Sequence, residues 1–233
     1  MEQIQFYQDN GLSFFPIPHG KKEANIAWKP YQDRKPTDQE VESWFNNGHQ
    51  HNIAVITGFN NLVVLDCDCD DRFYELDNIV FEKTGESLFD FTRVSKTSRG
   101  FHIWLFIEEL PPNQKFPKLD IKSTGGYVIA PPSLHPSGAE YQFVQFDIPI
   151  RHIKSLKDIG IDLEQKQTSQ VQTFPEGELI PRGVQNEWLF KRASSYRRQG
   201  DTEATILAKL ILDLQRCDQD MTNPFTENDL LQI

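Results

Sequence analysis

Two aspartates separated by one residue end an apolar run in the segment LVVLDCD, where Asp66 and Asp68 flank Cys67. A β-strand alternates its side chains between two faces, so both carboxylates would point the same way. Like charges this close repel, and a divalent cation relieves the repulsion. Carboxylate oxygens suit Mg²⁺ or Mn²⁺, so the pattern favours a metal site. Because Asp70 and Asp71 follow, a solvated acidic loop is the alternative.

A third aspartate lies on another short strand-like segment, LDIKSTGG, in which Asp120 and Lys122 share a face. A carboxylate on a neighbouring strand could complete a two-metal site, whose ions lie ~3.5–4 Å apart and stabilise both oxygens of a phosphoryl transfer. The alternative is a surface ion pair between Asp120 and Lys122.

A histidine follows a polar turn in the segment TSRGFHIWLF, which places Ser98, Arg99 and Gly100 just before His102. A hydroxyl, a guanidinium and an imidazole are good partners for the oxygens of a triphosphate. Gly100 allows an unusual backbone angle or a close approach to a ligand. The alternative is a hairpin histidine held by a backbone hydrogen bond.

The elements that must position these residues are short and mostly strand-like. Apolar runs bounded by Gly, Asn and Pro predict strands, and Thr37 with Glu40 has the spacing of a helix capping box. The predicted elements are a helix at Thr37–Asn46, strands at Asn52–Thr57 and Leu62–Asp68 around a turn at Gly58–Asn61, a hairpin of Arg93–Thr97 with Phe101–Ile107, a strand pair of Leu119–Ser123 with Tyr127–Ala130 around Gly125 and Gly126, and a last strand at Tyr141–Val144.

The C-terminal part of the chain has a helical pattern that follows a polar, Gln- and Thr-rich stretch at residues 164–178. That stretch predicts a linker. One helix is expected at Asn186–Gln199. A second is expected after an N-cap at Asp201, with Ala204, Leu207, Ile211 and Leu214 on one face, and a third would start at Thr226–Asp229. The chain stops four residues later, which suggests that the natural polypeptide continues.

Composition excludes several classes of protein. The 233 residues are 38% hydrophobic and 25% charged, and neither an 18-residue apolar run nor a secretory signal occurs. Three cysteines exclude a disulfide scaffold and fit a reducing compartment. Their spacing makes no zinc motif, and no P-loop is present. We therefore expect a cytoplasmic, monomeric protein that does not interact with membranes.

The net charge of −10 conceals a local excess of positive charge. Residues 91–125 carry six basic and three acidic side chains, and residues 166–200 carry the same numbers. Because salt confines electrostatic fields to about 10 Å, local basic patches can bind a polyanion on an acidic protein. Ordinary solvated faces are the alternative.

Three motifs, taken in order, resemble those of the archaeo-eukaryotic primase superfamily. They are the D-x-D pair, the S-x-G-x-H hairpin, and the D-h-K segment (h is an apolar residue) followed by GGY and PPS. The closest likeness is to the bifunctional primase–polymerase (prim-pol) domains of plasmids, phages and CRISPR-associated loci. The similar segments cover about residues 10–150 and are GLSFFPIPHGKK, AWKPYQ, NIAVITG, LVVLDCDCD, TRVSKTSRGFHIWLF and LDIKSTGGYVIAPPSLHPSG.

This resemblance implies an α+β fold, with an RRM-like antiparallel sheet and an α/β unit in a catalytic domain at residues 1–163. The linker at 164–178 would lead to a small all-α domain at residues 179–233, in which Gly183 and Asn186 occupy a G-x-x-N pattern typical of the family. Such domains support primer initiation or link to a helicase, so a helicase and replication or CRISPR proteins are possible partners.

The resemblance also implies the roles of individual residues. Two Mg²⁺ or Mn²⁺ ions would bind the catalytic aspartates Asp66, Asp68 and Asp120. The incoming nucleotide's phosphates would contact Ser98, Arg99, His102 and Lys122. The family often has Gly-Gly before the histidine, whereas this chain has Arg99, Gly100 and Phe101. Nucleic acid would contact a basic face of the helical domain formed by Lys191, Arg192, Arg197 and Arg198.

The implied activity is that of a nucleotidyltransferase that starts DNA primers de novo on a single-stranded template and extends them from dNTPs or NTPs. Two other classes remain open from the sequence. One is a non-catalytic module that binds single-stranded DNA or initiates replication. The other is a metal-dependent phosphodiesterase.

Overall fold

The computed structural model describes residues 2–163, 179–180, 185–198 and 201–217. The chain divides into two compact units, residues 1–162 and 163–233, which are considered separately below. In chain order the first unit contains α1 (Glu2–Asp9), β1 (Phe14–Pro18), η1 (Lys29–Gln32), α2 (Asp38–Phe45), β2 (His51–Thr57), η2 (Phe59–Asn61), β3 (Leu62–Cys67), α3 (Asp70–Thr84), α4 (Leu88–Phe91), β4 (Val94–Lys96), β5 (Phe101–Ile107), β6 (Gln114–Phe116), β7 (Leu119–Lys122), β8 (Gly126–Ala130), β9 (Gln142–Phe143), β10 (Arg151–Ile153) and η3 (Leu156–Ile159).

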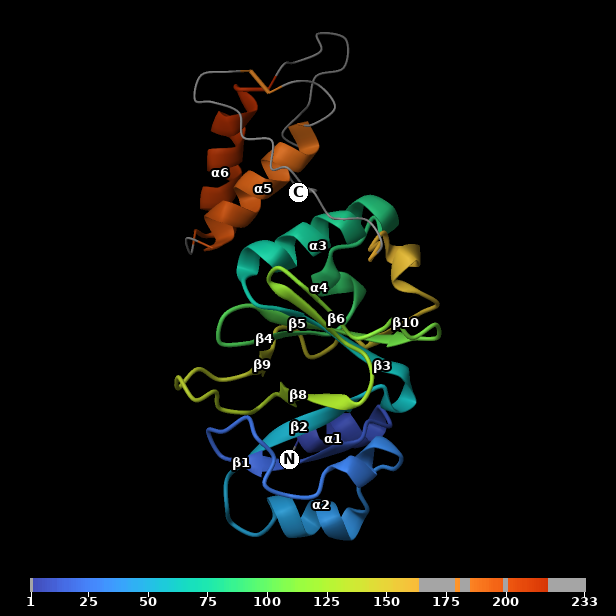
Figure 1. Cartoon of the computed structure of the whole chain (residues 1–233). Helices are drawn as coiled ribbons and strands as arrows, with labels where there is room; N and C mark the ends of the chain where they lie inside the picture. The colour runs from blue at the N-terminus through green and yellow to red at the C-terminus, as the bar shows by residue number, and fades with distance from the viewer. Residues whose placement is uncertain (1, 164–178, 181–184, 199–200, 218–233) are drawn as a thin grey trace. The chain divides into compact units, whose positions relative to one another are not determined.

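Two sheets form the first unit. The smaller sheet has the order β1-β2-β8, and the larger has the order β6-β7-β3-β5-β4-β9. All of these strand pairs are antiparallel, and β10 adds to β5 in parallel. Helices α3 and α4 cover one face of the larger sheet, whose other face is turned toward the smaller sheet (Figure 1). The first unit therefore has the mixed α/β architecture with antiparallel sheets that the sequence predicts.

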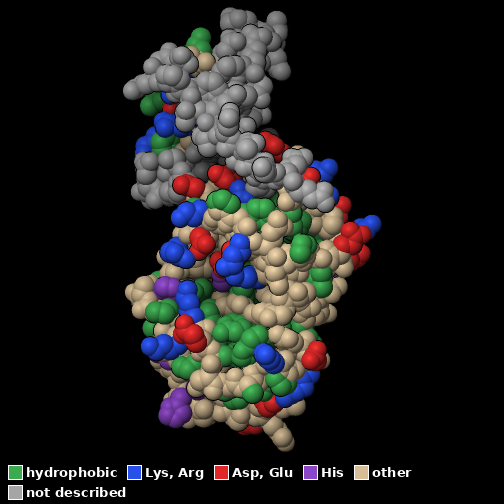
Figure 2. All heavy atoms as spheres, in the orientation of Figure 1, with side chains coloured by type: hydrophobic (Ala, Val, Ile, Leu, Met, Phe, Trp, Pro, Cys, Tyr) green, Lys and Arg blue, Asp and Glu red, His purple; other side chains and the backbone are tan. Residues whose placement is uncertain are grey.

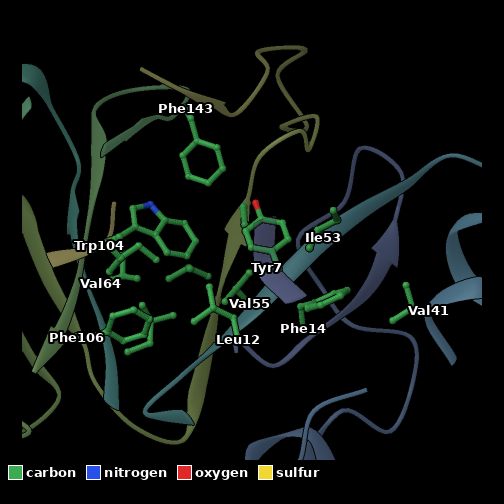
Figure 3. Close-up of a cluster of buried hydrophobic side chains, with 14 residues drawn as sticks. Tyr7, Leu12, Phe14, Val41, Ile53, Val55, Val64, Trp104, Phe106 and Phe143 are labelled. Carbon is green, nitrogen blue, oxygen red and sulfur yellow. The ribbon is translucent and has the colours of Figure 1, made fainter. Parts of the chain in front are cut away.

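The main core lies between the two sheets and is closed by α1 (Figure 3). Val64 and Trp104 contribute from the larger sheet, and Ile53 and Val55 contribute from the smaller one. From α1, the ring of Tyr7 stacks on Trp104 with the ring centroids 6.5 Å apart, and its hydroxyl donates to the carbonyl of Pro131. Alternate residues of β2, β3 and β5 therefore meet in this layer, as expected for strands buried on a shared face.

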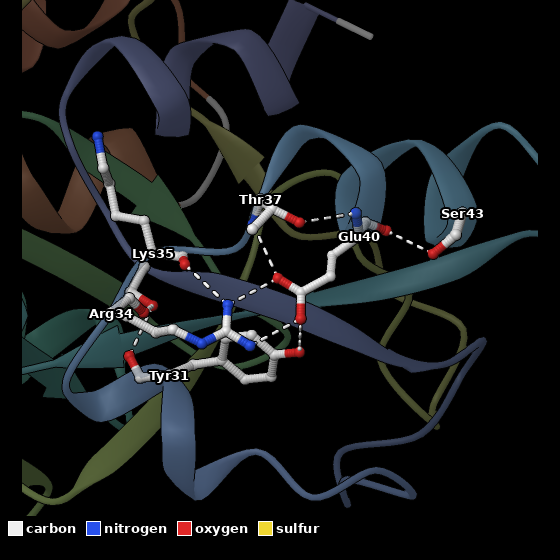
Figure 4. A network of polar contacts seen from close by, with 7 residues as sticks. Tyr31, Arg34, Lys35, Thr37, Glu40 and Ser43 are labelled. Carbon is white, nitrogen blue, oxygen red and sulfur yellow. Dashed lines mark hydrogen bonds and ion pairs between the residues drawn. The ribbon is translucent and has the colours of Figure 1, made fainter.

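A second cluster covers the outer face of the smaller sheet and is anchored at the start of α2 (Figure 4). Thr37 and Glu40 form the predicted capping box. Glu40 also accepts two hydrogen bonds of 2.7 Å from Arg34 and one of 2.9 Å from the hydroxyl of Tyr31. The hydrogen bonds from Arg34 are the main reason that the pKa of Glu40 falls to about 2.

Several predicted elements are confirmed. They are the helix after Thr37, the strands around Asn52–Thr57 and Leu62–Asp68, and the hairpin in which β4 pairs with β5. The predicted pairing of Leu119–Ser123 with Tyr127–Ala130 is wrong. Strand β7 pairs with β3 and β6, whereas β8 crosses to the smaller sheet and pairs with β2. Val128 and Ala130 of β8 pack between the sheets, whereas Ile129 packs on the outer face of the smaller sheet. Strand periodicity alone does not say which partner a strand takes.

One alternative and two expectations need correction. The alternative of a solvated acidic loop after Asp68 is wrong, because residues 70–84 form helix α3; Asp70 and Asp71 occupy its first turn, where acidic side chains interact favourably with the helix dipole. The strand near Tyr141 is short and is not the last, because β10 follows it. The N-cap of α6 is Thr202 rather than Asp201, since the Thr202 side chain accepts from the Thr205 N–H.

The described part of the second unit contains α5 (Gln185–Arg198), α6 (Glu203–Leu214) and a parallel bridge between Ile180 and Cys217. The two helices share an apolar core that includes Leu189, Ile206 and Leu210. The buried stripe of α6 is centred on Ile206, Leu210 and Asp213; of the predicted face, Leu207, Ile211 and Leu214 are only partly buried and Ala204 is exposed. The predicted linker and the third helix start lie outside the described residues.

No helix in the described ranges is both long enough and apolar enough to cross a membrane.

Candidate active site

The predicted site residues of three strands lie side by side in the larger sheet. Asp66 of β3 pairs directly with Asp120 of β7 on one side and with His102 of β5 on the other. Directly paired residues of antiparallel strands present their side chains to the same face, with Cβ atoms about 4.5–5.5 Å apart. Residues more than 50 positions apart in the chain are thus neighbours in one row. This row is extended by Lys115 beyond Asp120 and by Ser95 beyond His102.

The strand sequence explains why the row is polar at this level. Leu62 and Val64 occupy the same face of β3 and are fully buried between the sheets. Asp66 is the next residue on that face and is half-buried, so the strand changes from core to site within two residues. Cys67 points to the opposite face and is buried, which agrees with its predicted role as a small apolar residue. Burial also raises the pKa of its thiol far above the usual value, so it is a poor metal ligand.

Asp66 and His102 form the most buried polar pair of the site. His102 Nε2 lies 3.3 Å from Asp66 Oδ1, and only 5% of His102 is exposed. Its Nδ1 atom is buried without a hydrogen-bond partner. Burial alone would raise the pKa of Asp66, but His102, followed by Lys122 and Lys22, lowers it below its ordinary value. The carboxylate therefore remains ionised in a largely desolvated position.

Asp68 meets the tip of the β4–β5 hairpin. Arg99 Nη2 lies 2.6 Å from Asp68 Oδ1, and Arg99 is 70% exposed. Gly100 brings the hairpin close to β3, because a Cβ at this position would lie 2.1 Å from the Cys67 carbonyl oxygen. The Gly100 N–H donates to Thr97 Oγ1 at 3.1 Å, which closes the turn. The short hairpin and its glycine thus place Ser98 and Arg99 at the end of β3.

Asp120 is held by two lysines. Its Oδ2 lies 2.7 Å from Lys122 Nζ and 3.5 Å from Lys115 Nζ. The predicted ion pair with Lys122 is therefore present. It does not exclude a metal-binding role for Asp120, because a divalent ion would replace the two ammonium groups as its counter-charge. Figure 2 shows acidic, basic and histidine side chains gathered on one face of this unit, above an apolar patch.

The donors fit Mg²⁺ or Mn²⁺ in chemical type, since all three are carboxylates, and two of them are cross-strand neighbours. In the ranges that the structure describes, no three His, Cys, Asp or Glu side chains are close enough together to hold a metal ion. Each carboxylate is turned instead to a protein cation or imidazole: Asp66 to His102, Asp68 to Arg99, and Asp120 to Lys115 and Lys122. Binding of ions at this site would require these contacts to rearrange.

Sequence reasoning missed four residues that lie near the row. The Tyr141 ring lies 6.0 Å from the His102 ring, and burial followed by the charge of Asp66 raises its pKa to about 12. The Tyr141 ring also lies 6.2 Å from the ring of His135, whose pKa is lowered by burial and then by Lys22 and Arg99. Prediction of the β6–β7 hairpin from the sequence would have placed Lys115 opposite Asp120. The loop residues Lys22 and His135, in contrast, carry no local signal of their position.

The basic residues expected to contact nucleic acid in the second unit are not equivalent. Arg192 binds Asp213 at 2.7 Å and also contacts the hydroxyl of Tyr196, so its charge is used within the unit. Arg197 is exposed. The side chains of Lys191 and Arg198 lie outside the described part of the chain.

An antiparallel sheet that carries carboxylates, a histidine and cations in one row is the kind of site used to bind phosphates and metal ions. The model of the family described as bifunctional DNA primase/polymerase, N-terminal, matches residues 4–157, which is more than half of the chain. The chain belongs to this Prim-Pol family. Membership implies an enzyme of the nucleotidyltransferase type with DNA primase/polymerase activity. A comparison with curated proteins gives no match.

Proposed function

We propose that this protein starts DNA primers de novo on a single-stranded template and extends them by nucleotidyl transfer from dNTPs or NTPs. The observation that carries the proposal is the row of Asp120, Asp66 and His102 across β7, β3 and β5, with Asp68 and Arg99 at its end. Few structural roles would require two carboxylates side by side on adjacent strands, because the repulsion between them costs stability.

The three aspartates would hold two Mg²⁺ or Mn²⁺ ions, which, when bound, lower the pKa of the attacking 3′-hydroxyl and neutralise charge on the phosphates. Asp66 is suited to this role because it remains ionised although it is half-buried. Asp68 and Asp120 lie on either side of it, one along the same strand and one on the next strand. Together they supply acceptor oxygens at the surface where the phosphates must lie.

The hairpin residues would bind the triphosphate. Arg99 is mostly exposed, so its ion pair with Asp68 is weak and its guanidinium can move to a phosphate at little cost. A guanidinium offers a planar fork of donors that matches phosphate oxygens. His102, on β5 of the hairpin, contacts Asp66 through Nε2 and has a buried Nδ1 without a partner, so its ring lies beside the carboxylate with one nitrogen still unpaired. Ser98 and Lys122 would add further donors.

Positioning and charge neutralisation would account for most of the catalysis, because phosphoryl transfer demands little covalent chemistry from the protein. The template would be held through its backbone phosphates and by stacking of bases, which makes binding tolerant of sequence and sensitive to salt. Arg197 of the second unit is exposed and is available for such contacts.

The test is one reaction with labelled dNTPs or NTPs, an unprimed single-stranded template and Mn²⁺ or Mg²⁺. We expect new dinucleotides and longer products. If the protein extends a supplied primer but makes no product from the unprimed template, it is a polymerase and the proposal of de novo priming is wrong. A shortened template would indicate a phosphodiesterase, and a gel shift without any product would indicate a binding module; either result overturns the proposal.

A pair of matched variants connects the activity to the row. Asp66→Asn removes one negative charge at the centre of the site, and we expect nucleotide addition to fall about 1,000-fold or more. Asp90→Asn makes the same change on the exposed side of α4 and should leave the rate unchanged. Equal rates for both variants, each shown to be folded by circular dichroism, would contradict the assignment of Asp66.

A further inference from the structure

A pocket adjoins the acidic row on its β7 side. Its volume is about 470 Å³, within the range of sites that bind small molecules. Its walls come from the β6–β7 hairpin, the start of β8, the end of β2 and the loop that carries Trp28. Asp120 and Lys115 belong both to this pocket and to the row described above, and Lys122, which is paired with Asp120, also lines the pocket. A molecule bound in the pocket would therefore touch the catalytic surface.

One wall of the pocket is aromatic and another bears groups that form hydrogen bonds. Trp28 and Tyr127 are half-buried, with their rings edge to face and their centroids 5.1 Å apart. Thr57 lies on the lining, is 2% exposed, and its hydroxyl has no hydrogen-bond partner. Buried polar groups in folded proteins are nearly always paired, so this hydroxyl can form a hydrogen bond with a molecule in the pocket without losing a bond within the protein. Aromatic rings with nearby hydrogen-bonding groups suit a nucleobase.

The pocket also offers positive charge next to the row. Lys115 and Lys122 both line it, and both now share Asp120 as their partner. Lys115 is 83% exposed, so its ion pair contributes little to stability and its ammonium is available to a bound anion. An aromatic wall, a hydroxyl and two lysines together fit a nucleotide better than an uncharged molecule.

The position of the pocket indicates which nucleotide it takes. In an in-line displacement the attacking and leaving oxygens lie on opposite sides of the phosphorus. Three of the four residues expected to contact the incoming triphosphate, Ser98, Arg99 and His102, lie on the β5 side of Asp66. The pocket lies on the β7 side and shares only Lys122 with that set. The leaving pyrophosphate and the attacking hydroxyl would thus occupy opposite sides of the acidic row.

We propose that this pocket binds the nucleotide that carries the attacking 3′-hydroxyl, supplied either as a free initiating nucleoside triphosphate or as the terminal nucleotide of a primer. The inference rests on the proposed function. In the step, the 3′-oxygen forms a bond to the α-phosphorus of the incoming nucleotide, the bond from that phosphorus to pyrophosphate breaks, and the hydroxyl proton passes to solvent.

Two matched pairs of variants test the pocket. Lys115→Met removes a charge that lines it, whereas Lys118→Met removes one from the same hairpin that does not. Thr57→Val removes the orphaned hydroxyl that lines the pocket, whereas Ser123→Ala removes another buried, unpartnered hydroxyl that does not. In steady-state kinetics, the first variant of each pair should raise the KM for the initiating nucleotide or primer about tenfold, which corresponds to one hydrogen bond or ion contact.

The KM for the incoming dNTP should stay the same in all four variants, because the pocket lies on the other side of the row. Reactions on an unprimed template measure the free nucleotide, and reactions with a primer measure the terminal nucleotide, so a KM effect in one arm alone identifies the source. A change in the KM for the incoming dNTP, or no difference within either pair, would overturn the proposal while leaving the polymerase assignment intact.

A direct binding measurement separates the pocket from the activity. Titration of the wild type with a nucleoside 5′-monophosphate, followed by the fluorescence of Trp28 against a Trp28→Phe control, should show saturable binding that Thr57→Val weakens. If the wild type makes no product yet binds in this way, the proposed function fails; the pocket then remains a nucleotide-binding site, but its role in supplying the attacking hydroxyl is overturned. Absence of saturable binding would count against the pocket.

Discussion

At the scale of single residues, the site balances charge with few groups. Asp66 remains ionised because His102 and the lysines Lys122 and Lys22 offset the cost of its burial. The three aspartates each face a cation or imidazole of the protein, so the negative charge of the row is already compensated before any ligand binds. Binding of metal ions and substrate would therefore replace the protein cations at the aspartates by Mg²⁺ or Mn²⁺, rather than add positive charge to unpaired carboxylates.

His102 should matter for the reaction more than for the fold. Replacement by Gln retains a hydrogen-bonding side chain, and we expect nucleotide addition to fall about 100-fold or more because one phosphate ligand beside Asp66 is lost. Steady-state kinetics with a thermal melt measures both quantities. A normal rate in a folded His102→Gln variant would remove this residue from the site.

Arg99 provides a contrasting case at the hairpin tip. Since its side chain is 70% exposed, Arg99→Met should change the free energy of unfolding by less than about 0.5 kcal/mol. The KM for the incoming nucleotide should rise several-fold, and Arg99→Lys should restore only part of it, because a lysine lacks the planar fork. Chemical denaturation and kinetics on the same preparations test both statements; a KM equal to that of the wild type would contradict the role.

At the scale of elements, two contacts between neighbouring segments position the site and the sheet behind it. The β4–β5 hairpin reaches β3 only because Gly100 has no side chain, and α2 is held to the segment before it by the hydrogen bonds of Glu40. The first contact affects the proposed catalytic surface, and the second affects the stability of the first unit.

Gly100→Ala should destabilise the protein by about 2 kcal/mol or more, because the new Cβ would lie 2.1 Å from the backbone oxygen of Cys67, which cannot move freely. Gly126→Ala is the matched control, since its Cβ would meet Thr57 Oγ1 at an ordinary 3.7 Å. Urea denaturation of both variants measures the difference. Similar stabilities would show that the hairpin tolerates a side chain at this position.

Glu40 makes the stability of the first unit depend on pH. Hydrogen bonds from Arg34 lower its pKa to about 2 in the folded state, from about 4.5 in the unfolded chain, so the folded state binds fewer protons between these values. The stabilisation is complete above pH 4.5 and disappears as the pH falls through about 2. Glu40→Gln should therefore lower stability by about 1 kcal/mol at pH 7.

Melting curves from pH 7 down to pH 2 check this expectation, because the gap between wild type and Glu40→Gln should close as the pH falls. A gap that stays constant across this range would mean that the carboxylate of Glu40 does not stabilise α2 through its charge.

At the scale of the whole molecule, the chain has separate hydrophobic cores. Residues of the first unit form two clusters, one between the sheets and one on the outer face of the smaller sheet. Residues of the second unit form their own cluster around Leu189 and Leu210. The row and the pocket lie entirely within the first unit.

A chain truncated after residue 162 should therefore fold and unfold cooperatively, as a domain with its own core does. We expect its melting temperature to lie within a few degrees of the temperature at which the first unit unfolds in the full chain. Calorimetry on both proteins measures this, and a truncated chain without a cooperative transition would show that the first unit depends on the second.

The order and chemistry of the site residues could be read from the sequence alone. Alternation along LVVLDCD predicted that Cys67 would be buried, which is confirmed. The glycine before His102 was expected to allow an unusual backbone angle or a close approach to a ligand, whereas it allows the hairpin to approach the backbone of Cys67. These are local properties, set by the period of a strand and by the size of a side chain. Helix α3 was missed because its first turn is acidic and its apolar pattern is irregular.

Only the tertiary structure decided which strands are neighbours. Leu119–Lys122 pairs with β3, which brings Asp120 beside Asp66, while the next strand crosses to the other sheet. Strand pairing depends on which apolar faces meet in the core, and this is a property of the whole chain rather than of a segment. For the same reason, neither the pocket beside Asp120 nor the position of Tyr141 near His102 could be derived from spacing.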